Sequence, residues 1–367
     1  MKKIMVVMGT RPEAIKLCPL VRELRRRTAF ETLVCSTGQH RAMLDSALSA
    51  FSVKPDFDMD VMRTGQTLSD VTARILKKAD ELLVAERPDL VLVQGDTTTA
   101  FAGALAAFHR CVPVGHIEAG LRTYRMRDPF PEEFHRRAIA MMSDYHFAPT
   151  VTAKRNLLRE GYADDTVFIT GNTVVDALRI TLTEKRPLCE WNLPPDKRIL
   201  LFTAHRRESF GAPIREMLCA LRRIVEETPD VLAFFPVHHN PEVRRAAIEI
   251  LKGVPRIRMI EPPEIVSFHH LLSRAYMILT DSGGIQEEAS VLGIPTIVMR
   301  YSSERTEGMR AGVLKLAGSG EAGIVSLAKR LLEKDSEEYA SMHRPSAIYG
   351  DGNASVRIAD ILEKKLP

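Results

Sequence analysis

Three acidic residues have a spacing that suits proton transfer. Asp96 and Glu118 each end an apolar run, and Glu132 follows on the next loop. If those runs are parallel strands, their carboxyl ends share one edge of a sheet and the carboxylates converge there. Asp96 also fits a helix cap before Thr98, and Glu132 also fits an ordinary helix start. Glu118 is harder to explain without a ligand or cation, because an unpaired buried carboxylate is costly.

Two loops carry the residue types of an anion site. Gly9-Thr10-Arg11-Pro12 follows an apolar run and combines a turn, a guanidinium and a proline suited to a first helical turn. Asp281-Ser282-Gly283-Gly284 follows another run, and its glycines let phosphate oxygens approach backbone amides. Glu287 or Glu288, about one turn further, would take ribose hydroxyls. The first loop also fits an ordinary turn with a solvated arginine, and the second fits a capped helix.

Other cofactor and metal patterns are missing from the sequence. It contains neither G-x-G-x-x-G nor the P-loop pattern, so we expect no cofactor and no ATP chemistry. It has no H-E-x-x-H or Cys/His cluster, and the pairs His238-His239 and His269-His270 would point apart on a strand, so we expect no metal. His205 begins a basic run, His205-Arg206-Arg207, which fits either a phosphate-facing group or a solvated loop.

The composition is that of a globular protein with two domains. A chain of 367 residues exceeds the roughly 250–300 residues that one hydrophobic core spans. Hydrophobic residues make up 45% and charged residues 27%, which excludes a disordered chain. The formal net charge of +4 comes from interspersed charges, so neither a nucleic-acid nor a membrane partner is expected.

The cysteines and the first residues predict a cytoplasmic protein. The apolar run at the start is interrupted by Arg11, Glu13 and Lys16, so it predicts a strand, not a signal peptide. The cysteines are odd in number, scattered and without a C-x-x-C pair, which predicts reduced thiols in the cores: Cys18, Cys35, Cys111, Cys189 and Cys219.

Alternating strand and helix patterns predict an α/β protein with two doubly wound, Rossmann-like domains. The proline-rich stretch 184–197 separates a domain of residues 1–184 from one of residues 197–353, and a last helix at 354–366 is able to pack back on the first domain. Strands are predicted at 3–8, 31–35, 90–93, 112–116, 145–147, 167–169, 199–203, 232–236, 257–260, 277–280 and 296–299. Helices are predicted from Pro12, at 68–85, at 98–109, from near Pro131, at 322–333 and at 354–365.

Taken together and in order, nine segments resemble the bacterial non-hydrolysing UDP-N-acetylglucosamine 2-epimerases. They span nearly the whole chain: GTRPEAIK, QGDTTT, HIEAGLRT, PFPEE, ITGNTVVDAL, AHRRES, PVHHNP, TDSGGIQEEA and YGDG. The resemblance implies the glycosyltransferase-B architecture, with UDP held in an interdomain cleft. It implies interconversion of UDP-N-acetylglucosamine and UDP-N-acetylmannosamine by anti elimination of UDP and re-addition to 2-acetamidoglucal. A homodimer is expected, with UDP-N-acetylglucosamine and UDP as the small-molecule partners.

Carried over position by position, the resemblance also implies roles for single residues. Those matching the family's catalytic residues are Asp96, Glu118, Glu132 and His205. Those matching contacts with the UDP-sugar are Arg11, Lys16, Arg136, Phe268, Ser282, Gly283, Gly284 and Glu288. The residues leave open which acid serves which face of the sugar's C2.

Three positions depart from the family's usual pattern. Gln94 stands where histidine commonly precedes the Gly-Asp pair, His135 where asparagine commonly precedes Arg136, and Thr306 where proline is usual. All three are predicted to lie near the site, so they bear on substrate preference and rate.

Two other activities fit the same fold. A glycosyltransferase would share the fold and the UDP site, and fold alone does not separate the two activities. A 2-epimerase of a UDP-diacetamido sugar would keep the chemistry, although such relatives tend to carry G-A-R-P-Q-F where this chain has GTRPEA. A UDP-sugar sensor without catalysis is a further alternative.

Overall fold

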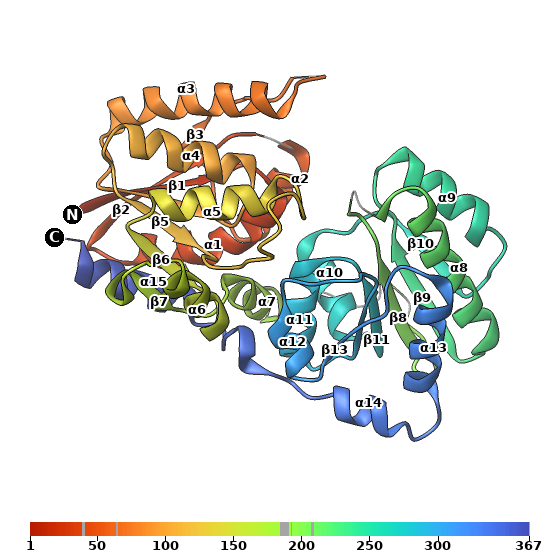
Figure 1. Ribbon diagram of the computed structural model, residues 1–367. Helices are drawn as coiled ribbons and strands as arrows, with labels where there is room; N and C mark the ends of the chain where they lie inside the picture. Colours follow the sequence, from red (N-terminus) through yellow and green to blue (C-terminus); the bar gives the residue numbers. More distant parts are fainter. Residues whose placement is uncertain (39–40, 64, 184–190, 192, 207–208, 367) are drawn as a thin grey trace. The chain divides into compact units, whose positions relative to one another are not determined.

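Two compact units make up the chain in the computed structural model (Figure 1). Unit 1 comprises Met1–Ile180 and Tyr349–Pro367, and unit 2 comprises Thr181–Ile348. The residues that the structure describes are 1–38, 41–63, 65–183, 191, 193–206 and 209–366. The predicted boundary at 184–197 lies largely outside them, so its role in separating two domains stays a prediction.

Unit 1 is built on a seven-stranded parallel sheet with the order β3-β2-β1-β4-β5-β6-β7. Its strands are β1 (Lys2–Met8), β2 (Phe30–Ser36), β3 (Phe57–Asp58), β4 (Leu90–Gln94), β5 (Val114–Ile117), β6 (Tyr145–Ala148) and β7 (Val167–Ile169). Its helices are α1 (Arg11–Arg26), α2 (Arg41–Ala50), α3 (Leu68–Glu86), α4 (Thr98–His109), α5 (Glu132–Met142), α6 (Val151–Arg159), α7 (Thr173–Thr183), which runs into unit 2, α15 (Ala354–Lys365) and the 3-10 turn η1 (Asp164–Thr166).

Helices cover both faces of this sheet. Alternate strand residues such as Met5, Val7 and Val91 pack with α3 and α4 in one core, and Figure 1 shows α3, α4 and α5 layered on that side. On α1, the buried stripe packs against β2, α2 and α15. Arg27, just after α1, forms ion pairs with Asp360 at 2.7 Å and Glu363 at 2.9 Å on α15. The end of the chain is thereby part of unit 1.

Unit 2 repeats this architecture with a six-stranded parallel sheet in the order β10-β9-β8-β11-β12-β13. Its strands are β8 (Arg198–Thr203), β9 (Val231–Pro236), β10 (Ile257–Ile260), β11 (Met277–Thr280), β12 (Thr296–Val298) and β13 (Leu314–Leu316). Its helices are α8 (Ala212–Glu227), α9 (Pro241–Leu251), α10 (Ile265–Ser273), α11 (Gly283–Leu292), α12 (Thr306–Arg310), α13 (Glu321–Leu332), α14 (Glu337–Met342) and the 3-10 turn η4 (Ala347–Tyr349).

Alternation along β8 divides the core of unit 2 into two layers. Leu200 and Phe202 pack with residues of α8, α9 and α13. Leu201 packs on the other side with residues of α10 and α11. Both faces of the sheet are thus apolar, as expected for parallel strands covered by helices.

The predicted α/β class with two Rossmann-like sheets is confirmed. Two short edge strands, β3 and β13, were not predicted. Among the described cysteines, Cys18 and Cys35 are buried, but Cys111 is exposed, so the expectation of a core thiol is wrong for Cys111. Cys189 lies outside the described residues. Among the helices of the described residues, none combines the length and apolar character needed to cross a membrane.

Candidate active site

The strand orders define where each unit can bind a ligand. In unit 1 the chain progresses in one direction from β1 to β3 and in the other from β4 to β7, so the topological switch lies between β1 and β4. In unit 2 the switch lies between β8 and β11. Ligands of open α/β sheets bind beyond the carboxyl ends of strands at such a switch. Most of the predicted site residues lie on the loops that follow these four strands or their neighbours, or on the helices into which those loops lead.

In unit 1, Glu13 links the two loops at the switch. Its Oε2 accepts hydrogen bonds from the N–H groups of Gly9 (3.2 Å) and Thr10 (2.8 Å) and from the Thr10 hydroxyl (2.7 Å). Its Oε1 accepts one from the Thr97 hydroxyl at 2.7 Å, on the loop after β4. Burial raises the pKa of Glu13 to about 7, although these donors act in the opposite direction. The carboxylate holds together the loops that carry Arg11 and Asp96.

Glu118 directly follows β5 and lies in a strained and buried position. Its φ of 65° lies in the left-handed region, which costs a residue other than glycine about 1–3 kcal/mol. The carboxylate pairs with the Lys16 ammonium and accepts a hydrogen bond from the Gln94 amide. Lys16 is buried too, so the cation meets the need that a buried carboxylate creates. Strain of this kind gathers at functional sites.

Asp96 lies on the neighbouring loop and is paired with another cation. Its Oδ2 accepts a hydrogen bond from the Arg136 guanidinium at 2.6 Å. Arg136 is almost fully buried on α5, whereas 29% of the Asp96 side chain is exposed. Gly95, just before it, has a φ of 70°, which glycine adopts at little cost. This turn leaves the carboxylate partly accessible from the sheet edge.

Glu133 holds Arg136 in place. Its carboxylate accepts hydrogen bonds from the N–H groups of Thr123 and Tyr124, both at 3.0 Å, and from Arg136 Nε at 3.1 Å. Glu133 has no exposed surface. It therefore ties the loop after β5 to the first turn of α5 and orients the guanidinium toward Asp96.

Two buried histidines fix the backbone around Asp96. His116 Nε2–H donates to the Gly95 carbonyl at 2.8 Å, and His135 Nδ1–H donates to the Asp96 carbonyl at 2.8 Å. A carbonyl only accepts, so these bonds assign the tautomers. Burial lowers the pKa of His116 to about 3 and also lowers the pKa of His135. Both rings are neutral near pH 7 and act as fixed donors.

The remaining predicted residues of unit 1 lie on the first turns of two helices. Arg11 opens α1 and is half-buried, and Glu132 opens α5 and is half-buried. A guanidinium at a helix N-terminus adds to the positive end of the helix dipole. The structure thus brings Lys16 to Glu118 and Arg136 to Asp96, although both cations were predicted as contacts of the UDP-sugar.

In unit 2, Asp281 links the loops at the switch as Glu13 does in unit 1. Its buried carboxylate accepts hydrogen bonds from the N–H groups of His205 (3.0 Å) and Arg206 (3.0 Å) and from the Ser209 hydroxyl (2.8 Å). The His205 side chain is 43% exposed, with Nδ1 at 3.4 Å from Asp281. Arg207, the third member of the predicted basic run, lies outside the described residues. The imidazole of His205 is accessible to a ligand while its backbone is held.

The N-terminus of α11 has the features that the sequence predicted for an anion site. Ser282 is the N-cap residue, but no side chain caps this helix within the described part of the chain. Its first N–H groups are then available to an anion. Gly283 is required sterically: a Cβ there would lie 2.8 Å from the guanidinium carbon of Arg305. A Cβ at Gly284 would meet no atom within 4 Å among the described residues.

Arg305 belongs to a buried charge cluster beside that helix. Arg305 Nε donates to Glu287 at 3.0 Å, and its other nitrogens contact Glu304. Glu304 also pairs with Arg206 at 3.3 Å and Arg300 at 3.2 Å. These guanidiniums hold the pKa of Glu304 well below its usual value, although burial acts in the opposite direction. The Arg305 guanidinium thereby lies next to Gly283, held by Glu287 and Glu304.

Glu288 and Phe268 lie on adjoining helices. Glu288 is buried on α11, and its Oε1 accepts a hydrogen bond from His269 Nε2 on α10 at 3.3 Å. Its Oε2 is buried and has no hydrogen-bond partner in the described part of the chain. Phe268 is half-buried on α10 and packs against the core beneath. The histidine pair 269–270 lies on a helix, so the expectation of a strand there is wrong.

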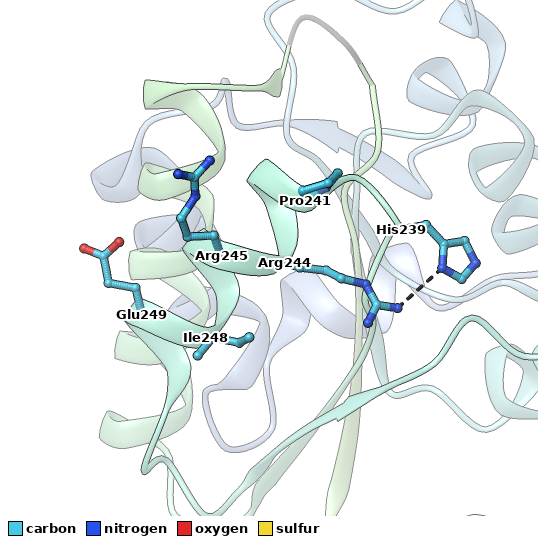
Figure 2. Close-up of a pocket in the computed structure, with 6 residues that line it drawn as sticks. All are labelled: His239, Pro241, Arg244, Arg245, Ile248 and Glu249. Atoms are coloured by element: carbon cyan, nitrogen blue, oxygen red, sulfur yellow. Dashed lines mark hydrogen bonds between the residues drawn. The ribbon is translucent and has the colours of Figure 1, made fainter. Parts of the chain in front are cut away.

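A surface depression of unit 2 lies along α9 and the end of the loop that precedes it (Figure 2). It has a volume of about 600 Å³ and is lined along α9 by His239, Pro241, Arg244, Arg245, Ile248 and Glu249. Arg244 pairs with Glu261, and Glu249 pairs with Arg215 at 2.6 Å. None of the predicted site residues lines it. Throughout the described ranges, no group of three or more His, Cys, Asp or Glu side chains is arranged to hold a metal ion.

Comparison with known proteins identifies the family. The family model for UDP-N-acetylglucosamine 2-epimerase matches residues 22–363. The chain belongs to this family. The UDP-N-acetylglucosamine 2-epimerase of Bacillus subtilis is 50% identical over 362 residues, which cover 98% of this chain and 94% of the relative. The Escherichia coli K12 enzyme of the same name is 47% identical over 370 residues, with 98% of both chains covered.

Solved structures of relatives extend the agreement to the whole fold. The Neisseria meningitidis epimerase, solved with bound UDP-GlcNAc, matches with a TM-score of 0.96 at 42% identity and covers 100% of both chains. A Staphylococcus aureus relative solved with UDP matches with a TM-score of 0.94 at 45% identity and covers 100% of this chain and 97% of that one. The two-domain, glycosyltransferase-B class predicted from the sequence is confirmed.

Several residues of the site were missed by sequence reasoning. Glu13 had a signal, because Thr10 and Glu13 have the spacing of a capping box. Nothing in the sequence distinguishes Glu133 from its neighbour Glu132, because both are acidic residues at the start of the same helix. Arg305 and His269 are brought to the site only by chain segments that are distant in sequence. Two of the residues that depart from the family pattern contact the site. Gln94 donates to Glu118, and His135 bonds to the Asp96 carbonyl.

Proposed function

We propose that this chain interconverts UDP-N-acetylglucosamine and UDP-N-acetylmannosamine by inverting C2 of the sugar. The observation that carries the proposal is the pair of carboxylates at one sheet edge, Asp96 and Glu118, each held by a buried cation. In a chain of this family, these groups suit proton removal and return at carbon.

The chemistry requires the anomeric bond to break first or in concert with proton loss. The C2 hydrogen has no neighbouring carbonyl, so a carboxylate does not remove it from the intact sugar. As UDP departs, positive charge develops at C1 and acidifies that hydrogen, while negative charge develops on the β-phosphate. Elimination gives 2-acetamidoglucal, and re-addition of UDP with protonation of the other face gives the epimer. Each step conserves the proton and the UDP leaving group.

In unit 1, Asp96, Glu118 and Glu132 supply the proton-handling groups for the two faces of C2. Two faces need at least two such groups. The Lys16 ammonium pairs with the Glu118 carboxylate, and the Arg136 guanidinium pairs with that of Asp96, so each acid is held in place at the sheet edge. Arg11, at the positive end of α1, supports the departing phosphate.

In unit 2, the N-terminus of α11 and the neighbouring groups hold UDP. The amides of Gly283 and Gly284 and the Ser282 hydroxyl face the diphosphate, with His205 as a further donor. Phe268 lies by the uracil, and Glu288 accepts hydrogen bonds from the ribose. No dinucleotide is needed, because the elimination route forms no ketone.

Deuterium incorporation tests this function directly. The chain is incubated with UDP-N-acetylglucosamine in deuterated water, and the sugar is followed by NMR. We expect UDP-N-acetylmannosamine to form with deuterium at C2 and no net release of UDP at equilibrium. Transfer of the sugar to an acceptor without deuterium at C2 would show a glycosyltransferase instead. UDP binding with neither reaction would show a sensor.

We also propose that the chain forms a homodimer through α4 and α5. Phe108 on α4 and Phe134 and Met141 on α5 expose 55%, 44% and 72% of their surface. The ring of Phe134 lies 5.7 Å from that of Phe101 on α4. Since both helices run back along a parallel sheet, Phe108 and Met141, each seven residues further on, are expected to be neighbours as well. An exposed apolar stripe of this kind suits a two-fold contact between identical surfaces.

The dimer is tested by light scattering coupled to size exclusion. We expect the wild-type chain at twice its monomer mass, and Phe108→Glu at the monomer mass with its unfolding temperature nearly unchanged. Val151→Glu, which changes an exposed apolar residue of α6, is the matched control and should leave the mass unchanged. A wild-type monomer at micromolar concentration would exclude the dimer.

A further inference from the structure

His269 is a buried histidine that the proposed chemistry does not use. It lies on α10 with no exposed surface and touches two polar partners from different parts of unit 2. Its Nε2 is 3.3 Å from Glu288 Oε1 on α11, and its Nδ1 is 2.6 Å from the Thr181 hydroxyl on α7. The three side chains form a line from α7 through α10 to α11.

The chemistry of the partners assigns the protons along this line. A carboxylate has no proton to give, so His269 Nε2 carries the hydrogen and donates it to Glu288. In the tautomer with its hydrogen on Nε2, Nδ1 is an acceptor, and the Thr181 hydroxyl, which is able to donate, supplies the hydrogen. Thr181 thereby selects the tautomer that Glu288 requires, as a second partner does for many functional histidines.

One carboxylate oxygen is left for a ligand. Glu288 Oε1 is engaged by His269, whereas Oε2 is buried and has no partner in the parts of the chain that the structure describes. A buried polar atom without a partner is costly, and such atoms call for an explanation. A ligand that supplies two adjacent hydroxyls, as ribose does, would satisfy the free oxygen and share the other one.

We propose that His269 is a positioning residue: it fixes the Glu288 carboxylate so that the carboxylate accepts hydrogen bonds from the ribose hydroxyls of UDP. The inference rests on the proposed function, because it takes UDP as the ligand of α11. It predicts that His269 governs the preference for ribose over deoxyribose and leaves the epimerisation step itself unchanged.

Binding of UDP and of 2′-deoxy-UDP to the full chain tests the inference by calorimetry. We expect the wild-type chain to prefer UDP by about tenfold or more, the usual size of a hydrogen bond to a charged group. His269→Asn should reduce this preference to about threefold or less, because the shorter amide does not reach Glu288. His269→Gln should keep most of it, because its amide nitrogen takes roughly the place of Nε2.

Two further measurements separate positioning from a general structural role. The kcat for UDP-N-acetylglucosamine should stay within about twofold in His269→Asn while KM rises, since ribose contacts bind the ground state and transition state alike. His270→Asn, one residue on and rotated by about 100° around α10, is the matched control and should keep the wild-type preference. Both variants at position 269 place a polar amide in the buried site, so a difference between them reports on the contact with Glu288 and not on misfolding.

Each outcome decides the inference. An unchanged preference in His269→Asn, or an equal loss of affinity for both nucleotides, would overturn it while UDP binding stands. A wild-type chain that binds UDP without preferring it over 2′-deoxy-UDP would show that Glu288 does not hold the ribose. A wild-type chain that binds neither nucleotide would overturn the proposed function and this inference together.

Discussion

The switch points of the two units have the same topology but different chemistry. In each, one buried carboxylate joins the loops that follow the two central strands: Glu13 between β1 and β4, and Asp281 between β8 and β11. Beyond this shared support, unit 1 presents carboxylates held by cations. Unit 2 presents backbone amides, guanidiniums and Glu288, whose Oε2 has no hydrogen-bond partner among the described residues.

This difference separates two tasks that one α/β unit would find hard to combine. Carboxylates that accept protons from a sugar repel a diphosphate, whereas the amides at a helix N-terminus and nearby guanidiniums attract one. Two sheets with similar loops allow each electrostatic environment to be built separately.

The largest effect is expected from the acids of unit 1. Glu118→Gln, Asp96→Asn and Glu132→Gln should each lower turnover by about 10² or more, because the amide accepts no proton. The affinity for UDP, measured by calorimetry, should stay within about threefold, because unit 2 is unchanged. Glu81→Gln, an exposed acid of α3, is the control. Near-normal turnover in all three variants would remove these acids from the mechanism.

Removing the charge of Asp281, which supports the loops of unit 2, should weaken UDP binding, in contrast to the unit 1 acids, whose loss should leave UDP affinity nearly unchanged. Asp281→Asn replaces the charged acceptor of two backbone N–H groups and the Ser209 hydroxyl by a neutral one, so it should lower the free energy of unfolding by about 2–3 kcal/mol and weaken UDP binding. Urea titration and calorimetry measure the two effects. Unchanged UDP affinity in a folded Asp281→Asn variant would show that the His205 loop takes no part in binding.

Glu13, the corresponding support in unit 1, should make stability depend on pH. Its pKa is raised from 4.5 to about 7 in the folded chain, so the folded state binds more protons than the unfolded state between these values. The stabilisation is therefore present below about pH 4.5 and is lost as the pH rises through 7, by at most about 3 kcal/mol. Urea unfolding of the wild-type chain and Glu13→Gln from pH 4.5 to 8 measures this.

The contribution of Glu13 is obtained by subtracting the free energy of unfolding of Glu13→Gln from that of the wild-type chain at each pH. Burial lowers the pKa of His116 to about 3 and of His146 to about 4, so these residues make stability rise with pH below about 6.5 in both chains. Subtracting the two curves cancels that contribution. A difference that does not change with pH would show that Glu13 is ionised throughout.

The two glycines at the start of α11 should respond oppositely. Gly283→Ala forces the Arg305 guanidinium away from a Cβ at 2.8 Å, and should cost about 1–3 kcal/mol of stability because Glu287 and Glu304 hold that group. Gly284→Ala has free space and should be neutral or stabilise by up to about 1 kcal/mol. Equal unfolding temperatures for the two variants would contradict the contact with Arg305.

The smallest effect is expected at the surface depression of Figure 2. Arg244→Ala breaks an exposed pair with Glu261 and should change stability by about 0.5 kcal/mol or less. Turnover and UDP affinity should equal those of the wild-type chain. A tenfold loss of either would show that the active site includes α9.

Periodicity and residue type were sufficient to predict most of the architecture. The helices Thr98–His109 and Ala354–Lys365 were predicted to the residue: the first is an alanine-rich, largely apolar run, and the second has an apolar face. Most strands were predicted within two residues at each end. Strands β3 and β13 were missed because two or three residues at a sheet edge carry too little periodicity to detect.

Local sequence also indicated where the site would lie, because the ends of buried strands and the starts of helices are local features. What it could not decide was which charges meet. Lys16 is 102 residues from Glu118, Arg136 is 40 residues from Asp96, and Arg305 is 18 residues from Glu287. These pairs depend on strand order and on the packing of helices, which set the partner of each buried charge, and only the tertiary structure determines them.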